Sequence, residues 1–146
     1  MHVRWYIIAG AIVLGLLIMT MKAKATVAGG SLTDSRIQAL ADAIGGIEGS
    51  PGGNLGIRQG KTATRDDLVT FLTGAFVNGT SSYYDASMSF RALAWTWVCG
   101  PQAWNGGDPK PELCDPRDNP ETWALFVAGR LGVDVNSTVG DYLSGM

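Results

Sequence analysis

The chain has 146 residues and a formal net charge of −2, so it is long enough for one small domain and has no excess positive charge to attract a nucleic acid. Two cysteines and a single histidine, His2, do not supply the usual ligands of a zinc site, and we expect no metal and no cofactor. Twenty glycines and six prolines predict many turns.

The N-terminal 25 residues form the first unit. Trp5–Met21 contains no charged residue and would be about 25 Å long as a helix, near the short end of the range for a membrane span. Lys22 and Lys24 follow it, where their side chains can snorkel. We therefore predict a single-pass membrane anchor in residues 1–25, with the span at residues 5–21. Ala23–Ala25 also resembles a signal-peptidase site, so a cleaved signal peptide is the alternative. The basic residues after the span weakly favour a domain on the cytoplasmic face.

A flexible tether, residues 26–31, is expected next, and the remaining residues, 32–146, are expected to form the soluble domain. Ser31 and Asp34 have the spacing of a capping box, which predicts that a helix begins here. Apolar residues at helical spacing follow and predict one buried face: Ile37, Leu40, Ala41, Ile44 and Ile47.

Glu48 ends this helix and is followed by a turn, Ser50–Asn54, which is rich in glycine and cannot continue it. At about 100° per residue, Glu48 lies roughly 40° from Ile44, on the apolar face. A carboxyl group at the edge of a core loses hydration, so we expect its pKa to rise and the group to hold a proton near neutral pH. The alternative is a helix-ending glutamate that points into solvent.

Later helices are predicted from their caps and apolar spacing. Thr64–Asp67 has the capping-box pattern, Ser89 can cap a third helix, and Asn119–Pro120 is typical of a helix start. That fourth helix should end at Gly132, and residues 135–143 predict a short final helix. Because no strand alternation is evident, the predicted fold class is all-α.

Cys99 and Cys114 bound a loop rich in glycine and proline. A disulfide between them would close about 15 residues and stabilise the fold by about 3 kcal/mol. We favour this disulfide over two free thiols, which a reducing cytosol would maintain.

Several short motifs, taken in order, resemble the phage structural lytic transglycosylase domains of the lysozyme-like superfamily. The resemblance covers about residues 37–143 and rests on Ile47–Gly49, Pro51–Leu55, Ser81–Ser89, Asn119–Glu121 and Phe126–Val133. It implies a small lysozyme-like helical domain that binds peptidoglycan glycan strands. The loop between Glu48 and Asn54 has only five residues and departs from the family pattern, as does the cysteine-bounded loop.

The resemblance also implies roles for individual residues. Glu48 occupies the place of the family's catalytic acid. Asn54 matches an asparagine after the glycine turn, and Gln59 ends a segment loosely similar to the family's G-L-M-Q. With these we predict that Tyr83 and Tyr84 contact the sugar, although tyrosines in a serine-rich turn also serve as structural edge residues.

The pattern of acidic residues favours one catalytic carboxyl group. A lytic transglycosylase resembles half of the two-carboxylate scheme of ordinary glycosidases: its acid protonates the leaving oxygen and then acts as base on the sugar's own 6-hydroxyl. Asp42 lies about 120° from Glu48 around the helix, and no motif places Asp85. The position nine residues after Glu48, where a phage lysozyme would have aspartate, is Ile57.

Two classes of function follow. The first is a membrane-anchored, single-glutamate lytic transglycosylase of a virion that cleaves the MurNAc–GlcNAc bond during phage genome entry. It would lie in a virion internal membrane or the host inner membrane, with other virion proteins as partners. The second is a non-catalytic virion or membrane protein that retains the fold as a binding module. A lysis enzyme with a releasable signal anchor is a third hypothesis.

Overall fold

A computed structural model describes residues 25–48 and 63–145, and this part of the chain is mostly helical, which confirms the all-α class. The helices are α2 (Ser31–Glu48), α3 (Arg65–Phe76), α4 (Phe90–Cys99), α5 (Pro120–Leu131) and α6 (Val139–Ser144). Between α4 and α5 lie two 3₁₀ turns, η1 (Pro101–Ala103) and η2 (Pro111–Leu113), and two short strands, β1 (Trp104–Asn105) and β2 (Asp108–Pro109). The strands pair antiparallel, with Trp104 opposite Pro109.

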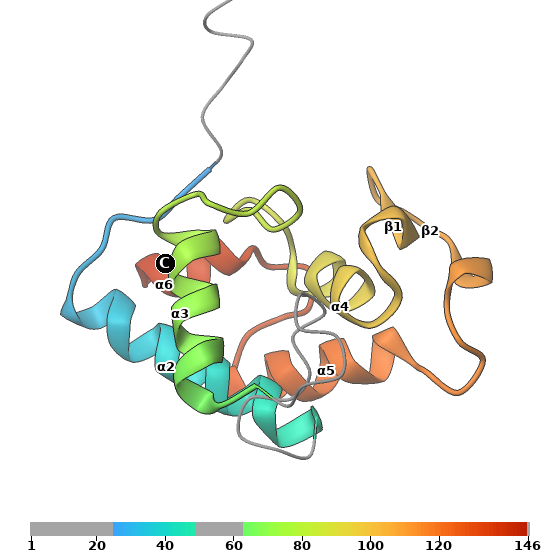
Figure 1. Cartoon of the computed structure of the whole chain (residues 1–146), viewed down its shortest axis with the longest axis horizontal. Helices are drawn as coiled ribbons and strands as arrows, with labels where there is room; N and C mark the ends of the chain where they lie inside the picture. Colours follow the sequence, from blue (N-terminus) through green and yellow to red (C-terminus); the bar gives the residue numbers. More distant parts are fainter. Residues whose placement is uncertain (1–24, 49–62, 146) are drawn as a thin grey trace, which may run out of the picture.

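The helices pack around one core. Helix α2 packs against α3, α5 and α6, and α4 packs against α5, while the β1–β2 hairpin and η2 lie at one side of the helices (Figure 1). The apolar face predicted for α2 is buried: Ile37, Leu40 and Ile44 are at most 1% exposed. Large side chains from the other helices complete the core: Leu68, Leu72, Phe76, Phe90, Leu93, Val127, Val139 and Leu143.

The predicted caps of the middle helices are confirmed. Thr64 and Asp67 form a reciprocal capping box at the start of α3. The Ser89 hydroxyl accepts the backbone N–H of Ala92 at 3.0 Å, and Asn119 caps α5 with Pro120 in its first turn. At the end of α5, Gly132 adopts the left-handed conformation, with φ 69° and ψ 30°. These ends agree because each depends on a few neighbouring residues.

The predicted start of the first helix is confirmed, because α2 begins at Ser31, although the backbone N–H of Asp34 donates to the Gly30 carbonyl and not to the Ser31 side chain. The predicted start of the last helix is wrong, because that helix begins at Val139 and not at residue 135. Asp134 forms a turn in which its carboxylate accepts the Asn136 N–H at 2.7 Å, and this turn occupies the predicted first residues of the helix.

Residues 26–31, predicted as a flexible tether, are hydrogen-bonded to the domain. The Val27 N–H donates to the Phe76 carbonyl at 2.9 Å, and just before the tether Ala25 pairs with both Asp85 and Ala86. Within residues 25–48 and 63–145, no helix is long and apolar enough to cross a membrane. The predicted span, residues 5–21, lies outside the described residues.

The disulfide predicted between Cys99 and Cys114 is present, with their Cα atoms 4.7 Å apart. It joins the last residue of α4 to the end of η2. The intervening loop therefore returns to α4 before the chain enters α5.

Candidate functional site

Glu48 is the last residue of α2, and its side chain meets α5. Its Oε1 atom accepts a hydrogen bond from the Trp123 indole Nε1 at 3.0 Å. Trp123 is buried, only 4% exposed, so the donor has a defined position. The Glu48 side chain is exposed, and the predicted loss of hydration is therefore wrong. The buried run of α2 ends at Gly45, one turn before the carboxyl group.

Glu48 lines a groove of about 470 Å³, which we call the Glu48 groove. Its walls come from the ends of α2 and α4, the start of α5 and the segment that leads into α5. The lining residues are Ile47, Glu48, Trp97, Val98, Arg117, Asp118, Asn119, Thr122 and Trp123. The groove thus combines two indole rings with carboxyl, amide, hydroxyl and guanidinium groups, a mixture suited to a polar ligand that has an apolar face.

An aromatic cluster lies behind this groove. The Trp97 ring is 6.0 Å from Trp123, 5.8 Å from Tyr84 and 5.9 Å from Phe71, measured between ring centroids. Phe71 and Tyr84 also meet edge to face at 5.4 Å. Burial raises the pKa of the Tyr84 phenol. Tyr84 therefore packs against Trp97, one of the two indoles of the Glu48 groove, and is not among the residues that line the groove.

The two neighbouring tyrosines, predicted to act together, face different surroundings. Tyr83 is 60% exposed and lines a second groove, which also contains Trp104. Only Tyr84 reaches the aromatic cluster next to Glu48. Asn54 and Gln59, the other predicted substrate-binding residues, lie outside the described part of the chain.

The acidic residues considered as partners of Glu48 are engaged elsewhere. Asp42 pairs with Arg65 at 2.6 Å, and the hydrogen bond from Arg65 lowers the pKa of the Asp42 carboxyl. The Asp85 carboxylate accepts the backbone N–H groups of Ala25 and Ser87 at 3.0 and 2.8 Å. Neither lines the Glu48 groove.

Asp118 is a second carboxyl group in the Glu48 groove, and sequence reasoning did not single it out. It follows Asp115 and Arg117, which pair with each other at 2.9 Å. In the sequence, Asp118 is marked only by its position just before the Asn119 cap. Its place in the groove depends on how the disulfide returns the chain to α4, which no local pattern predicts.

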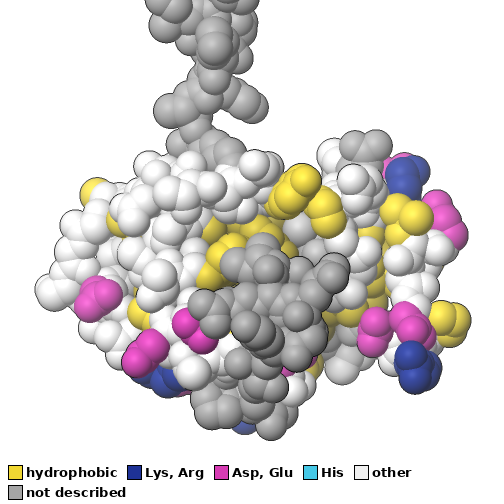
Figure 2. All heavy atoms as spheres, viewed as in Figure 1, with side chains coloured by type: hydrophobic (Ala, Val, Ile, Leu, Met, Phe, Trp, Pro, Cys, Tyr) yellow, Lys and Arg dark blue, Asp and Glu magenta, His cyan; other side chains and the backbone are white. Residues whose placement is uncertain are grey.

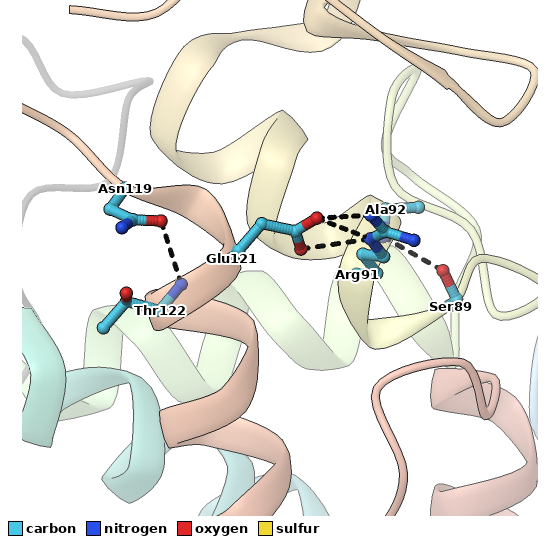
Figure 3. Close-up of polar contacts among 6 residues, drawn as sticks. All are labelled: Ser89, Arg91, Ala92, Asn119, Glu121 and Thr122. Carbon is cyan, nitrogen blue, oxygen red and sulfur yellow. Dashed lines mark hydrogen bonds and ion pairs between the residues drawn. The ribbon is translucent and has the colours of Figure 1, made fainter. Parts of the chain in front are cut away.

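Ion pairing and capping hold the start of α5 against α4 (Figure 3). The Arg91 guanidinium lies against the Glu121 carboxylate, with Nε 2.8 and 3.0 Å from its two oxygens. The Asn119 side-chain carbonyl accepts the Thr122 N–H at 3.2 Å. These contacts place Asn119 and Thr122 at the rim of the Glu48 groove, and among the described residues the amide hydrogens of the Asn119 side chain have no hydrogen-bond partner.

No group of three or more potential metal ligands occurs within residues 25–48 and 63–145. Comparison of the chain with protein-family models, curated proteins and solved structures found no match.

Proposed function

We propose that the chain is a peptidoglycan lytic transglycosylase in which Glu48 is the catalytic acid. The observation that supports this most directly is the Glu48 carboxyl group, held by the Trp123 indole in a groove of about 470 Å³. The motif resemblance described above supports the same reaction, and the lysozyme-like fold is part of this proposal.

In this proposal Glu48 protonates the oxygen of the MurNAc–GlcNAc bond as that bond breaks. The carboxylate then takes the proton of the muramic acid 6-hydroxyl, whose oxygen attacks the anomeric carbon and forms a 1,6-anhydro ring. Because the nucleophile belongs to the sugar, this route needs no second carboxylate to activate water. The Trp123 N–H orients the carboxyl group for both proton transfers.

Residues around Glu48 would bind the glycan. The indole rings of Trp97 and Trp123 offer apolar surface to the C–H face of a sugar ring, and Asn119 and Thr122 offer hydrogen bonds to its polar groups. Residues 5–21 would anchor the enzyme in a virion internal membrane or the host inner membrane, beside the wall that it opens during genome entry.

The variant Glu48→Gln tests the proposal, because it keeps the shape of the side chain and removes the transferable proton. Cleavage of purified peptidoglycan should fall by about 10²-fold or more. Glu112→Gln, at an exposed position in η2, is the matched control and should cleave as well as wild type. Mass analysis of the wild-type products should find 1,6-anhydromuramic ends. A wild-type protein that binds glycan without cutting it would instead support the non-catalytic binding module.

Asp118 favours a second candidate, a hydrolytic muramidase that uses two carboxyl groups. An Asp118 carboxylate in the same groove could activate water, and the products would then carry reducing ends. Asp118→Asn separates the two routes. The transglycosylase should retain most of its cleavage in this variant, whereas the hydrolase should lose about 10²-fold or more.

A further inference from the structure

A second groove of about 580 Å³ lies on another side of α4. We call it the Trp104 groove. Ala92 and Thr96 of α4 line it, whereas Trp97 and Val98 line the Glu48 groove. At 100° per residue these two pairs point in different directions around the helix. The two grooves share no lining residue, so a ligand in one does not occupy the other.

The side chains of the Trp104 groove are uncharged and combine polar groups with apolar ones such as Met88 and Pro101. Two aromatic side chains, several hydroxyl groups and one carboxamide line it: Tyr83, Trp104, Ser82, Thr96, Thr138 and Asn136. On the face of the molecule drawn in Figure 2, hydrophobic and other uncharged side chains occupy the upper middle, and the coloured Lys, Arg, Asp and Glu side chains lie outside that area. An anion or cation would find no opposite charge in the lining, and a purely apolar ligand would leave the polar groups unpaired.

The Trp104 ring is held in position before any ligand arrives. The Arg91 guanidinium lies over it at 5.7 Å from the ring centre, and the Trp95 ring lies 6.3 Å away. Arg91 is itself fixed by Glu121. A preset aromatic surface loses little conformational entropy when it binds a ligand.

The hairpin turn keeps the groove open beside Trp104. Gly106 and Gly107 have φ angles of 61° and 91°, and a Cβ atom at either position would meet no described atom within 4 Å. These two glycines also line the groove. The backbone there is free of side chains and leaves room next to the indole.

Several polar groups of the groove are free to bind a ligand. Within the described part of the chain, no hydrogen bond engages the side chains of Ser82 and Asn136. The hydroxyl oxygens of Ser89 and Thr138 accept backbone N–H groups as helix caps, which leaves each hydroxyl proton for another acceptor. Donors and acceptors thus surround a fixed aromatic ring.

We propose that the Trp104 groove is a second binding site, one that takes an uncharged oligosaccharide. Sugar rings present an apolar C–H face to Trp104 and Tyr83, while their hydroxyl and acetamido groups pair with the hydroxyls and with Asn136. The identification of this oligosaccharide as a strand of the wall glycan rests on the proposed function. The site would hold the strand while Glu48 acts at the other groove.

The probe for this site is the N-acetylglucosamine tetramer, titrated into full-length Glu48→Gln protein in zwitterionic micelles without sugar headgroups. Indole ¹⁵N–¹H resonances report each groove separately, through Trp104 and Trp123, and Trp104→Phe assigns the first of them. The Trp104 resonance should shift and saturate. Tyr83→Ala and Asn136→Ala should each weaken that titration by about tenfold and leave the Trp123 titration unchanged.

Leu125→Ala is the matched control, because Leu125 is 64% exposed and lines neither groove, and Tyr83 is 60% exposed. A Trp104 resonance that does not respond to the tetramer would overturn the site, as would equal titrations in the Tyr83, Asn136 and Leu125 variants. Wall cleavage by wild-type protein is scored separately. Cleavage without a response of the Trp104 resonance would reject only the second binding site. A response of the Trp104 resonance without cleavage would reject only the proposed enzymatic activity.

Discussion

The helical core and the segment from Cys99 to Asn119 are held together by different forces. In the core, large side chains from α2, α3 and α4, such as Leu40, Leu72 and Phe90, are completely removed from water. In the segment, Ala103 is the only fully buried one of the described side chains, and the disulfide, the short hairpin and local turns supply the order. Burial therefore stabilises the first region, and a covalent link and backbone hydrogen bonds stabilise the second.

Both grooves have one wall from each region. The core supplies Trp97 and Trp123 to the Glu48 groove, and the segment supplies Asp118 and Asn119. The Trp104 groove likewise lies between the core and the β1–β2 hairpin. Stability and groove shape are therefore separable in this protein: a change in the segment should alter binding while the helices persist.

The largest loss of stability should result from a substitution that creates a cavity in the core. Leu40→Ala removes most of a completely buried side chain and should lower the free energy of unfolding by about 2–5 kcal/mol. Chemical denaturation followed by circular dichroism measures the loss. Leu125→Ala, at a 64% exposed position in α5, should change stability little. Equal losses in the two variants would contradict the packing described here.

Removing the disulfide should disorder the segment from Cys99 to Asn119 while the helical core stays folded. The double variant Cys99→Ala/Cys114→Ala should lose about 3 kcal/mol of stability, the value expected for a loop of about 15 residues. Far-ultraviolet circular dichroism at low temperature should nevertheless retain the helical signal, while the Trp104 resonance loses its response to the N-acetylglucosamine tetramer.

Alkylation of the native protein supplies the control for the disulfide. Without reductant, neither cysteine should react. Two freely alkylated thiols, or a double variant as stable as wild type, would show that the segment does not depend on the covalent link.

Replacing Trp123, whose indole N–H donates to Glu48, should test what the core contributes to catalysis in the Glu48 groove. Trp123→Phe keeps an aromatic ring and removes the N–H that holds Glu48, so kcat/KM for wall cleavage should fall about fivefold to tenfold. Leu125→Ala is the control, because Leu125 lies in the same helix as Trp123, is 64% exposed and lines neither groove. Equal kcat/KM values in the two variants would remove Trp123 as a positioning residue.

The smallest expected effect is the contribution to stability of the exposed ion pair between Asp42 of α2 and Arg65 of α3. The hydrogen bond from Arg65 lowers the pKa of Asp42 in the folded protein, so this contribution to stability is present above the ordinary aspartate pKa of 3.8. It is lost as the pH falls through the lowered value. The difference in melting temperature between wild type and Asp42→Asn should be small at neutral pH and vanish in acid. A difference in melting temperature that grows as the pH falls would contradict the expected pH dependence.

Features that depend on neighbouring residues could be predicted from the amino-acid sequence. Thr64, Ser89 and Asn119 accept N–H groups three residues ahead, and Gly132 adopts a conformation that few other residues tolerate. The apolar spacing of α2 predicted its buried face for the same reason, since a helix repeats every few residues. The all-α class and the helix that ends at Glu48 could therefore be predicted from local patterns.

The assembly of the candidate site depends on contacts between helices that are distant in the sequence. Glu48 lies beside Trp123, 75 positions later in the chain, because α5 packs against α2, and no local pattern encodes that contact. The separation of Tyr83 from Tyr84 and the entry of Asp118 into the Glu48 groove likewise depend on contacts between distant segments. Such contacts follow from the burial of several helices at once and from the disulfide that returns the chain to α4, so their geometry becomes defined only when the whole domain packs.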